Sequence, residues 1–370
     1  MKIISVSHYS QSIINNSSNQ IRLVQHFLDY ISLNFYSRII RLLNYRFNKR
    51  SHTKKAIAIF YKLKSINIIM SVNIPITFLG TSQAIPTAKR NHTAILLQYK
   101  DENILVDCGE GTQRQFRKAR LNPCKLTRLL ITHWHGDHIL GIAGLLQTLL
   151  LNSYNKTLYV YGPKGTKQDL HALIDLLVPY NKIPLVIQEV SEGKFLETKD
   201  FYLESIPVQH GIPCNAYSFV EKDKTRLDRK KLKKLKLPNS PLVGDLVKGK
   251  DIEFNGKKIK SKDIVYHEKG KKITIIMDTA HIENCEKIAK NSDIIISEAV
   301  YLNDEADLAA RHEHLTAEQA GQIAKHANAK KLYLAHLSQR YDGNEKLILK
   351  EAKKKFKDTF IAEDLMEIVI

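Results

Sequence analysis

Residues 129–141, which read LLITHWHGDHILG, constrain this chain more than any other stretch of it. An apolar run typical of a buried strand is followed at once by His133, His135, Asp137 and His138. Polar side chains of this kind are costly to bury without partners, so the core of a sheet has no use for them. We therefore expect a metal site where this strand ends, completed by ligands from elsewhere in the chain.

The spacing within this cluster predicts two neighbouring ions. In extended backbone, residues i and i+2 project to the same side, so His133 and His135 can bind one ion. Asp137 and His138 follow at the turn into a helix and can face a second ion. Ligands that combine nitrogen and oxygen in this way are typical of zinc or manganese.

Three further ligand candidates each come directly after a predicted strand, namely His210, Asp278 and His336. Their shared position at strand ends indicates that they converge on the same edge of the fold. An aspartate between two ions can bridge them with its two oxygens. Asp278 is the best candidate for that bridging role.

Short apolar strands alternate with helical segments from residue 74 onward, which predicts a layered α/β domain. Strands are expected at 76–79, 93–99, 103–106, 129–132, 158–161, 201–208, 216–220, 273–277, 294–297 and 331–334. Helices are expected at 139–151, 167–177 and 317–327. The 370 residues suffice for a large core, and the scattered cysteines favour buried thiols in a reducing compartment. No run of 18 or more apolar residues occurs, so we expect no membrane partner.

The net charge of +19 is concentrated in two segments. Residues 1–70 contain 11 Lys and Arg against Asp29 alone, and residues 222–262 contain 15 against five acids. Such localised positive charge suggests a polyanion partner, with solvated lysines that serve solubility as the alternative. Because residues 222–262 also interrupt the strand pattern, we predict that they form an insertion that leaves the body of the domain.

Residues 1–69 form a basic extension unlike the rest of the chain. Apolar residues recur at helical spacing over 21–43, which is typical of an amphipathic targeting or membrane-surface helix. Met70, however, stands directly before the first predicted core strand. We therefore favour Met70 as the functional start of a domain that spans 70–370. We expect a cytoplasmic protein, with organelle targeting by residues 1–69 as the lesser alternative.

Five further motifs surround the histidine cluster. They read FLGTSQAIPTAKRN at 78–91, VDCGEGTQRQ at 106–115, YGPKG at 161–165, HLT at 314–316 and HLSQRY at 336–341. With them the sequence resembles the metallo-β-lactamase superfamily and, within it, the ribonuclease Z family of tRNA 3′-processing endoribonucleases. The histidine cluster is common to the superfamily, whereas the PTAKRN, HLT and SQRY segments narrow the resemblance to ribonuclease Z over residues 74–370.

The resemblance implies a four-layer αββα sandwich with two Zn²⁺ ions per subunit at one edge, Mn²⁺ being the alternative metal. The ligands of one ion would be His133, His135 and His210. Those of the other would be Asp137, His138 and His336, with Asp278 bridging. The resemblance also implies a homodimer in which residues 222–262 are an arm that binds precursor tRNA.

The same resemblance implies a mechanism. Two ions about 3.5–4 Å apart can activate a shared water, which Asp137 would orient and help to deprotonate. His314 would protonate the departing ribose 3′-oxygen, and Glu298 would orient His314. The products would be a tRNA 3′-hydroxyl and a 5′-phosphate on the trailer. Two departures from the family pattern, Ser297 in place of a histidine and Met277 in place of a glycine, remove no metal ligand.

Substrate contacts are expected from two places. Lys89, Arg90 and Arg340 lie beside the predicted site and can meet phosphates, although Arg90 could equally brace its own loop. The lysines expected to follow the tRNA backbone as a group are Lys230, Lys231, Lys233 and Lys234.

Two other functions compete with precursor-tRNA cleavage. One is hydrolysis of a small molecule on the same scaffold, by a phosphodiesterase or an ester or lactone hydrolase. The other is RNA binding without catalysis. The basic insertion argues against the first, because a small substrate has no need of it. The complete set of ligands together with His314 argues against the second.

Overall fold

The computed structural model describes residues 73–238 and 240–370. The expectations for residues 1–69, including the functional start at Met70, lie outside this described part. No helix within it is long and apolar enough to cross a membrane.

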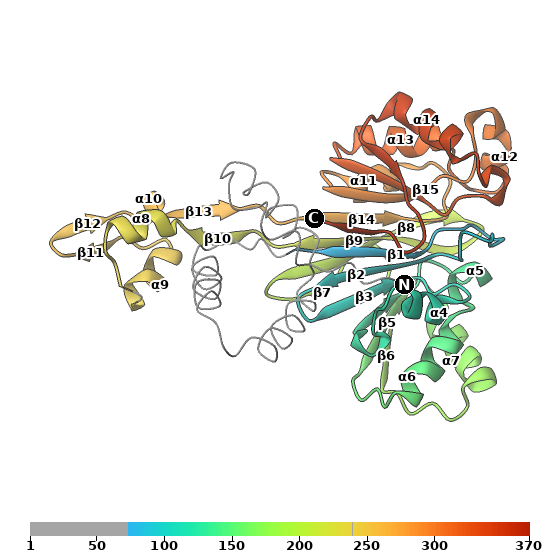
Figure 1. The fold of residues 1–370 in the computed structure, drawn as a ribbon, viewed down its shortest axis with the longest axis horizontal. Helices are drawn as coiled ribbons and strands as arrows, with labels where there is room; N and C mark the ends of the chain where they lie inside the picture. The colour runs from blue at the N-terminus through green and yellow to red at the C-terminus, as the bar shows by residue number, and fades with distance from the viewer. Residues whose placement is uncertain (1–72, 239) are drawn as a thin grey trace, which may run out of the picture. The chain divides into compact units, whose positions relative to one another are not determined.

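Two seven-stranded sheets form the centre of the fold (Figure 1). The first has the order β18-β1-β2-β3-β4-β5-β6. Its strands are β1 (Pro75–Gly80), β2 (Ala94–Tyr99), β3 (Glu102–Val106), β4 (Arg128–Leu130), β5 (Leu158–Gly162), β6 (Leu185–Glu189) and β18 (Glu367–Val369). The second has the order β17-β16-β15-β14-β9-β8-β7. Its strands are β7 (Gly193–Glu197), β8 (Phe201–His210), β9 (Ile212–Glu221), β14 (Lys272–Ile276), β15 (Ile294–Glu298), β16 (Lys331–Ala335) and β17 (Thr359–Ile361).

Helices cover the outer face of each sheet, which gives the four layers of an αββα sandwich (Figure 1). The helices on the side of the first sheet are α4 (Thr112–Lys118), α5 (Gly136–Ile139), α6 (Ile142–Leu151) and α7 (Thr166–Leu177). Those on the side of the second sheet are α11 (Glu283–Ala289), α12 (Ala306–Arg311), α13 (Ala317–His326) and α14 (Glu345–Lys355). Three short 3₁₀ turns complete the body, η2 (Pro123–Lys125), η3 (Asn303–Glu305) and η4 (Gln339–Tyr341).

Alternating side chains on the strands account for the layering. Leu97 on β2 and Ile296 on β15 face each other's sheet in a shared core, while their neighbours Leu96 and Ile295 face the outer helices. Both faces of each central strand are therefore buried, which explains the nearly continuous apolar runs in the sequence. Each such side chain contributes about 1.5–3 kcal/mol through burial.

The helix expected at 139–151 is observed as the shorter α6, and the separate turn α5 precedes it and ends at Ile139. The division falls at Gly141, whose amide donates to Cys108 O at 2.9 Å. A Cβ at this position would lie 2.0 Å from the carbonyl oxygen of Gly109, so only glycine permits the approach. The break leaves α5 as a single turn that carries Asp137 and His138.

Parallel strands place the functional loops at one edge of the sandwich. Strands β3 to β6 are parallel in the first sheet, and β14 to β17 are parallel in the second. The carboxyl ends of parallel strands lie at the same edge of a sheet, and ligand sites form there. The segments after β4, β14 and β16 hold six of the seven predicted ligands, and the seventh, His210, is the last residue of β8.

The insertion leaves the second sheet between β9 and β14, and we call residues 224–268 the arm. Its base is an antiparallel ribbon of β10 (Lys224–Leu227) and β13 (Val265–Glu268). The ribbon carries α8 (Arg229–Lys234), α9 (Pro241–Val247), β11 (Ile252–Phe254), β12 (Lys257–Ile259) and α10 (Ser261–Ile264). Buried apolar residues from α9 to α10 form a small core of its own, and Figure 1 shows the arm extending away from the sheets. The ribbon ends six residues beyond the Lys-rich segment 222–262.

Candidate metal centre

The structure brings all seven predicted ligands together at the edge of the two sheets. His133 and His135 follow β4, and Asp137 and His138 lie on α5. The remaining three are His210 at the end of β8, Asp278 after β14 and His336 after β16. Their ligand atoms form two groups, and within each group all atoms lie within 4.8 Å of one another. The groups are His133, His135, His210 and Asp278, and Asp137, His138 and His336.

Asp278 lies between these two groups and turns one carboxylate oxygen toward each. Its Oδ2 is 3.7 Å from Nε2 of His133 and 3.5 Å from Nε2 of His210. Its Oδ1 is 3.4 Å from Nε2 of His138 and 2.9 Å from Nε2 of His336. This is the arrangement that a carboxylate bridging two cations requires.

The polar atoms that point into this space fit a cation. Nε2 of His133, His138 and His336 and Oδ1 of Asp278 are buried and have no hydrogen-bond partner among the described residues. Each buried polar atom without a partner costs about 1–3 kcal/mol. Four such atoms gathered around the Asp278 carboxylate are explained by metal ligation, which would satisfy the atoms of each group.

The opposite ring nitrogens are held by the protein, which turns Nε2 toward the centre. Nδ1 of His138 lies 2.8 Å from Oδ2 of Asp107, and Nδ1 of His336 lies 2.6 Å from Oγ1 of Thr93. Asp107 also accepts hydrogen bonds from the backbone amide and the hydroxyl of Thr132, both at 2.8 Å. Partners of this kind fix the orientation of metal-binding imidazoles.

Sequence reasoning did not assign Asp107 a role, although a signal was present. This aspartate directly follows a strand, β3, that runs parallel to β4, so it reaches the same edge as the histidine cluster. Its φ is 57° and that of His336 is 51°, a left-handed conformation that is rare for residues other than glycine. Such backbone conformations are held by surrounding structure and gather at functional sites.

The charges around the centre favour a cation as well. Burial, with help from the neighbouring His138, lowers the pKa of His133 well below its ordinary value. Burial also opposes ionisation of Asp278, but the surrounding imidazoles of His336, His138 and His133 outweigh it and lower the pKa of Asp278. Burial lowers the pKa of His138 as well, but Asp278 and Asp107 outweigh burial and raise that pKa well above the ordinary value. The carboxylate of Asp278 is thus ionised, and a divalent ion bound here would displace the proton from the imidazole of His138.

A second pair, His314 and Glu298, lies beside Asp278. Nδ1 of His314 is 3.1 Å from Oε2 of Glu298 and 4.0 Å from Oδ2 of Asp278. Glu298 is fully buried, and its Oε1 accepts a hydrogen bond from Thr279 N at 2.7 Å. Burial lowers the pKa of His314, but the Glu298 carboxylate more than compensates and raises the pKa to about 9. The imidazole is therefore protonated at neutral pH.

The two departures from the family pattern leave the centre clear. Met277 is buried in the apolar core between the sheets, so its side chain does not crowd the ligands. The hydroxyl of Ser297 donates to the backbone carbonyl of Glu298 at 3.0 Å. Serine at this position thus supports the backbone of the glutamate that contacts His314.

The predicted substrate residues differ in what they contact. Arg90 is buried and donates to Thr81 Oγ1 and to Ala362 O, both at 2.7 Å. Its contacts match the alternative in which it braces its own loop. Arg340 is half exposed and pairs with Glu305 at 2.8 Å. The remaining ones are exposed, namely Lys89 and, on α8, Lys230, Lys231, Lys233 and Lys234.

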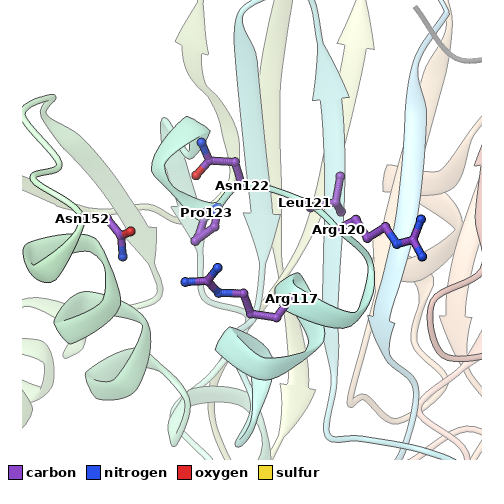
Figure 2. Close-up of a pocket in the computed structure, with 6 residues that line it drawn as sticks. All are labelled: Arg117, Arg120, Leu121, Asn122, Pro123 and Asn152. Atoms are coloured by element: carbon purple, nitrogen blue, oxygen red, sulfur yellow. The ribbon is translucent and has the colours of Figure 1, made fainter. Parts of the chain in front are cut away.

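A separate hollow of about 270 Å³ lies beyond the end of α4 (Figure 2). It is lined by Arg117, Arg120, Leu121, Asn122, Pro123 and Asn152. This lining contains no imidazole, thiol or carboxylate, so the hollow does not offer the ligands of a metal site.

The chain is similar in sequence to ribonuclease Z proteins from several organisms. Ribonuclease Z of Nanoarchaeum equitans is 39% identical over 290 residues, which cover 78% of this chain and 91% of that protein. Ribonuclease Z of Methanothermobacter thermautotrophicus is 37% identical over 297 residues, which cover 80% and 96%. A family model described as anti-Pycsar protein Apyc1 matches residues 74–224.

Solved structures give the same picture of the fold. The short form of human tRNase Z superposes with a TM-score of 0.58 at 26% identity, covering 80% of this chain and 98% of that one. The metallo-β-lactamase fold protein YhfI of Bacillus subtilis superposes with a TM-score of 0.60 at 20% identity, covering 81% and 100%. The expected four-layer metallo-β-lactamase sandwich is confirmed.

Proposed function

The chain belongs to the ribonuclease Z family, and we propose that its metal centre removes 3′ trailers from precursor tRNA. The observation that carries the proposal is that three imidazole nitrogens without a hydrogen-bond partner among the described residues, Nε2 of His133, His138 and His336, converge on the two oxygens of Asp278. The His314–Glu298 pair stands directly beside that point. A divalent-metal hydrolase acting on a phosphodiester needs both elements.

We assign the ligands by the grouping of their atoms. One Zn²⁺ would be held by His133, His135 and His210, and the other by Asp137, His138 and His336. Asp278 would contribute one oxygen to each. Mn²⁺ is the alternative, since both metals accept imidazole and carboxylate ligands. Bound there, the ions would supply an activated water and neutralise charge on the phosphoryl oxygens.

Asp137 is suited to accept a hydrogen bond from the attacking water and so to orient it, and the resemblance to the family implies that it also helps to take the proton. Burial opposes its ionisation, but His138 and His336 outweigh burial and lower the pKa of Asp137 well below the ordinary value. Its Oδ2 is held by the backbone amide of Ala84 at 2.9 Å. The carboxylate is partly exposed, unlike that of Asp278, so water can reach it.

His314 is suited to protonate the leaving group. Glu298 engages its Nδ1, which leaves Nε2 to donate a proton to the departing ribose 3′-oxygen. Thr316 and Gln319 form a reciprocal capping box at the start of α13, which fixes the segment that follows His314. Cleavage in this manner leaves a 3′-hydroxyl on the tRNA and a 5′-phosphate on the trailer.

The arm is proposed to bind the tRNA at a distance from the cut. Its exposed lysines on α8 carry no acidic residue among them, and their charge suits the phosphate backbone. Lys89 and Arg340 are proposed to contact phosphates nearer the centre. We also propose a cytoplasmic homodimer, as the resemblance to the family implies.

The deciding experiment is incubation with a 3′-extended precursor tRNA, with and without a chelator, followed by mapping of the cut. We expect one cut at the 3′ end of the mature tRNA sequence that depends on metal. Hydrolysis of bis(p-nitrophenyl) phosphate without any cleavage of the precursor would instead favour a small-molecule phosphodiesterase.

A further inference from the structure

The place where the arm leaves the sandwich contains a buried carboxylate, Glu221. It is the last residue of β9, and its side chain is 7% exposed. Neither the metal centre nor the exposed lysines of α8 account for a buried acid at this position. An unpaired carboxylate here would be strongly destabilising, so its partners show what it holds in place.

Both legs of the arm are joined to this one carboxylate. Lys224, the first residue of the outgoing strand β10, forms an ion pair with Oε1 of Glu221. The backbone amide of Lys271, on the returning chain, donates to Oε2 at 3.3 Å. The backbone amide of Glu221 in turn donates to Lys271 O at 2.8 Å. Glu221 thus joins the outgoing and returning chains at the root of the ribbon.

The third partner comes from the other sheet. Tyr99, the last residue of β2, donates its hydroxyl to Oε1 of Glu221 at 3.0 Å. The ring of Tyr99 is buried against Phe201 and Phe219, so its position is fixed by packing. Burial and the neighbouring carboxylate raise the pKa of Tyr99 well above its ordinary value, which keeps the hydroxyl as a donor. The root of the arm is therefore attached to both sheets.

Close backbone packing adds to this attachment. A Cβ at Gly270 would lie 1.9 Å from the carbonyl oxygen of Glu221, so the returning chain passes directly against the outgoing one. The amide of Gly270 donates to Oδ1 of Asp223 at 2.9 Å. The two legs can lie this close because residue 270 is glycine.

We propose that Glu221 and Tyr99 are positioning residues for substrate binding, which fix the direction in which the arm presents its lysines to the tRNA. The inference rests on the proposed function. Strand β10 spans about 13 Å at the usual rise per residue, so a rotation of roughly 15° at the root moves its far end by about 3 Å. A shift of that size exceeds the tolerance of a hydrogen bond or ion pair to phosphate.

The test compares Tyr99→Phe and Glu221→Gln with the wild type on two substrates. For precursor tRNA we expect KM to rise severalfold in Tyr99→Phe and roughly tenfold in Glu221→Gln. In these variants the arm and the metal centre would no longer be spaced to contact the same tRNA molecule at once. The kcat for precursor tRNA, and hydrolysis of bis(p-nitrophenyl) phosphate, should stay within about twofold. The double variant should resemble Glu221→Gln alone, since both changes act through one carboxylate.

Tyr154→Phe is the matched control. Its buried hydroxyl donates to Leu126 O at 2.8 Å, among the helices of the first sheet and away from the arm. It loses a similar hydrogen bond and should leave KM unchanged. Unchanged KM in both test variants, or an equal loss on the small diester, would overturn the inference. A wild type that hydrolyses the small diester but not precursor tRNA would instead overturn the proposed function, and the inference with it.

Discussion

Nδ1 of the His314 imidazole lies 3.1 Å from Oε2 of the buried Glu298 carboxylate. The two residues come from different elements, since Glu298 ends β15 and His314 precedes α13. Because Glu298 is held by the amide of Thr279, it can orient the ring and also stabilise its charge. A protonated, oriented histidine next to a hydrolytic centre is suited to act as general acid.

Replacement of His314 by alanine should therefore lower kcat for precursor tRNA by about 10²–10⁴, the usual contribution of a general acid. Metal content, measured by atomic absorption, should match the wild type, because His314 is outside the proposed ligand set. A substrate with a good leaving group, such as bis(p-nitrophenyl) phosphate, should lose much less activity. Equal losses on both substrates would contradict the role of proton donor.

Replacement of Glu298 by glutamine should change the pH dependence of kcat/KM. His314 must be protonated to donate, so activity falls as the pH rises through its pKa. That pKa is raised to about 9 by Glu298, and removal of the negative charge lowers it. The alkaline limb of the profile should then move to lower pH. A profile that drops in height without moving would show that Glu298 does not set the protonation of His314.

The apolar pattern of the sequence predicts the central strands well, because a strand that is buried on both faces is a nearly continuous run of apolar residues. The expected strands 76–79 and 331–334 correspond to β1 and β16 to within a residue or two at each end. In contrast, β6 and β7 were not expected, since their side chains are largely half-exposed or exposed and show no clear alternation. Edge strands of this kind owe their structure to pairing with a neighbour rather than to their own composition.

The candidate site, like the fold, could be predicted from the sequence only in part. Histidines at strand ends can be found in the sequence, and the expected groups agree with the two clusters of ligand atoms. The role of Thr93 beside His336 could not be found, because the two residues adjoin strands of different sheets and are 243 positions apart. Which ring nitrogen faces the centre depends on such distant partners.

Removal of metal should abolish cleavage and also lower the melting temperature. Without a cation, Nε2 of His133, His138 and His336 are buried without partners, whereas a bound ion stabilises only the folded state. Dialysis against a chelator, followed by calorimetry, measures this effect. Added Zn²⁺ or Mn²⁺ should restore both activity and melting temperature. Full activity in the chelated protein would rule out the proposed centre.

Removal of the arm should separate tRNA binding from catalysis. Lys224 and Glu268 pair directly across the ribbon, so residues 225–267 can be replaced by a two-residue Asn-Gly turn that keeps the ion pair between Lys224 and Glu221. We expect weaker binding of precursor tRNA with unchanged hydrolysis of a small diester. Alanine at Lys230, Lys231, Lys233 and Lys234 is the milder counterpart. It should flatten the salt dependence of binding while the arm stays folded.

A substitution of Arg90 can decide whether this residue braces its own loop or contacts the substrate. Its guanidinium donates to Thr81 and Ala362 and pairs with Glu345 at 3.4 Å, so its donors serve the protein itself. Arg90→Lys cannot reproduce this set of bonds, because lysine lacks the planar fork. Chemical denaturation should show a loss of about 1–3 kcal/mol, the cost of leaving buried acceptors unpaired. Since the side chain is not free to meet phosphate, KM for precursor tRNA should stay close to that of the wild type. A large rise in KM at unchanged stability would instead place Arg90 among the substrate-binding residues. Lys89→Ala, at the exposed neighbouring position that is proposed to contact phosphate, is the comparison variant.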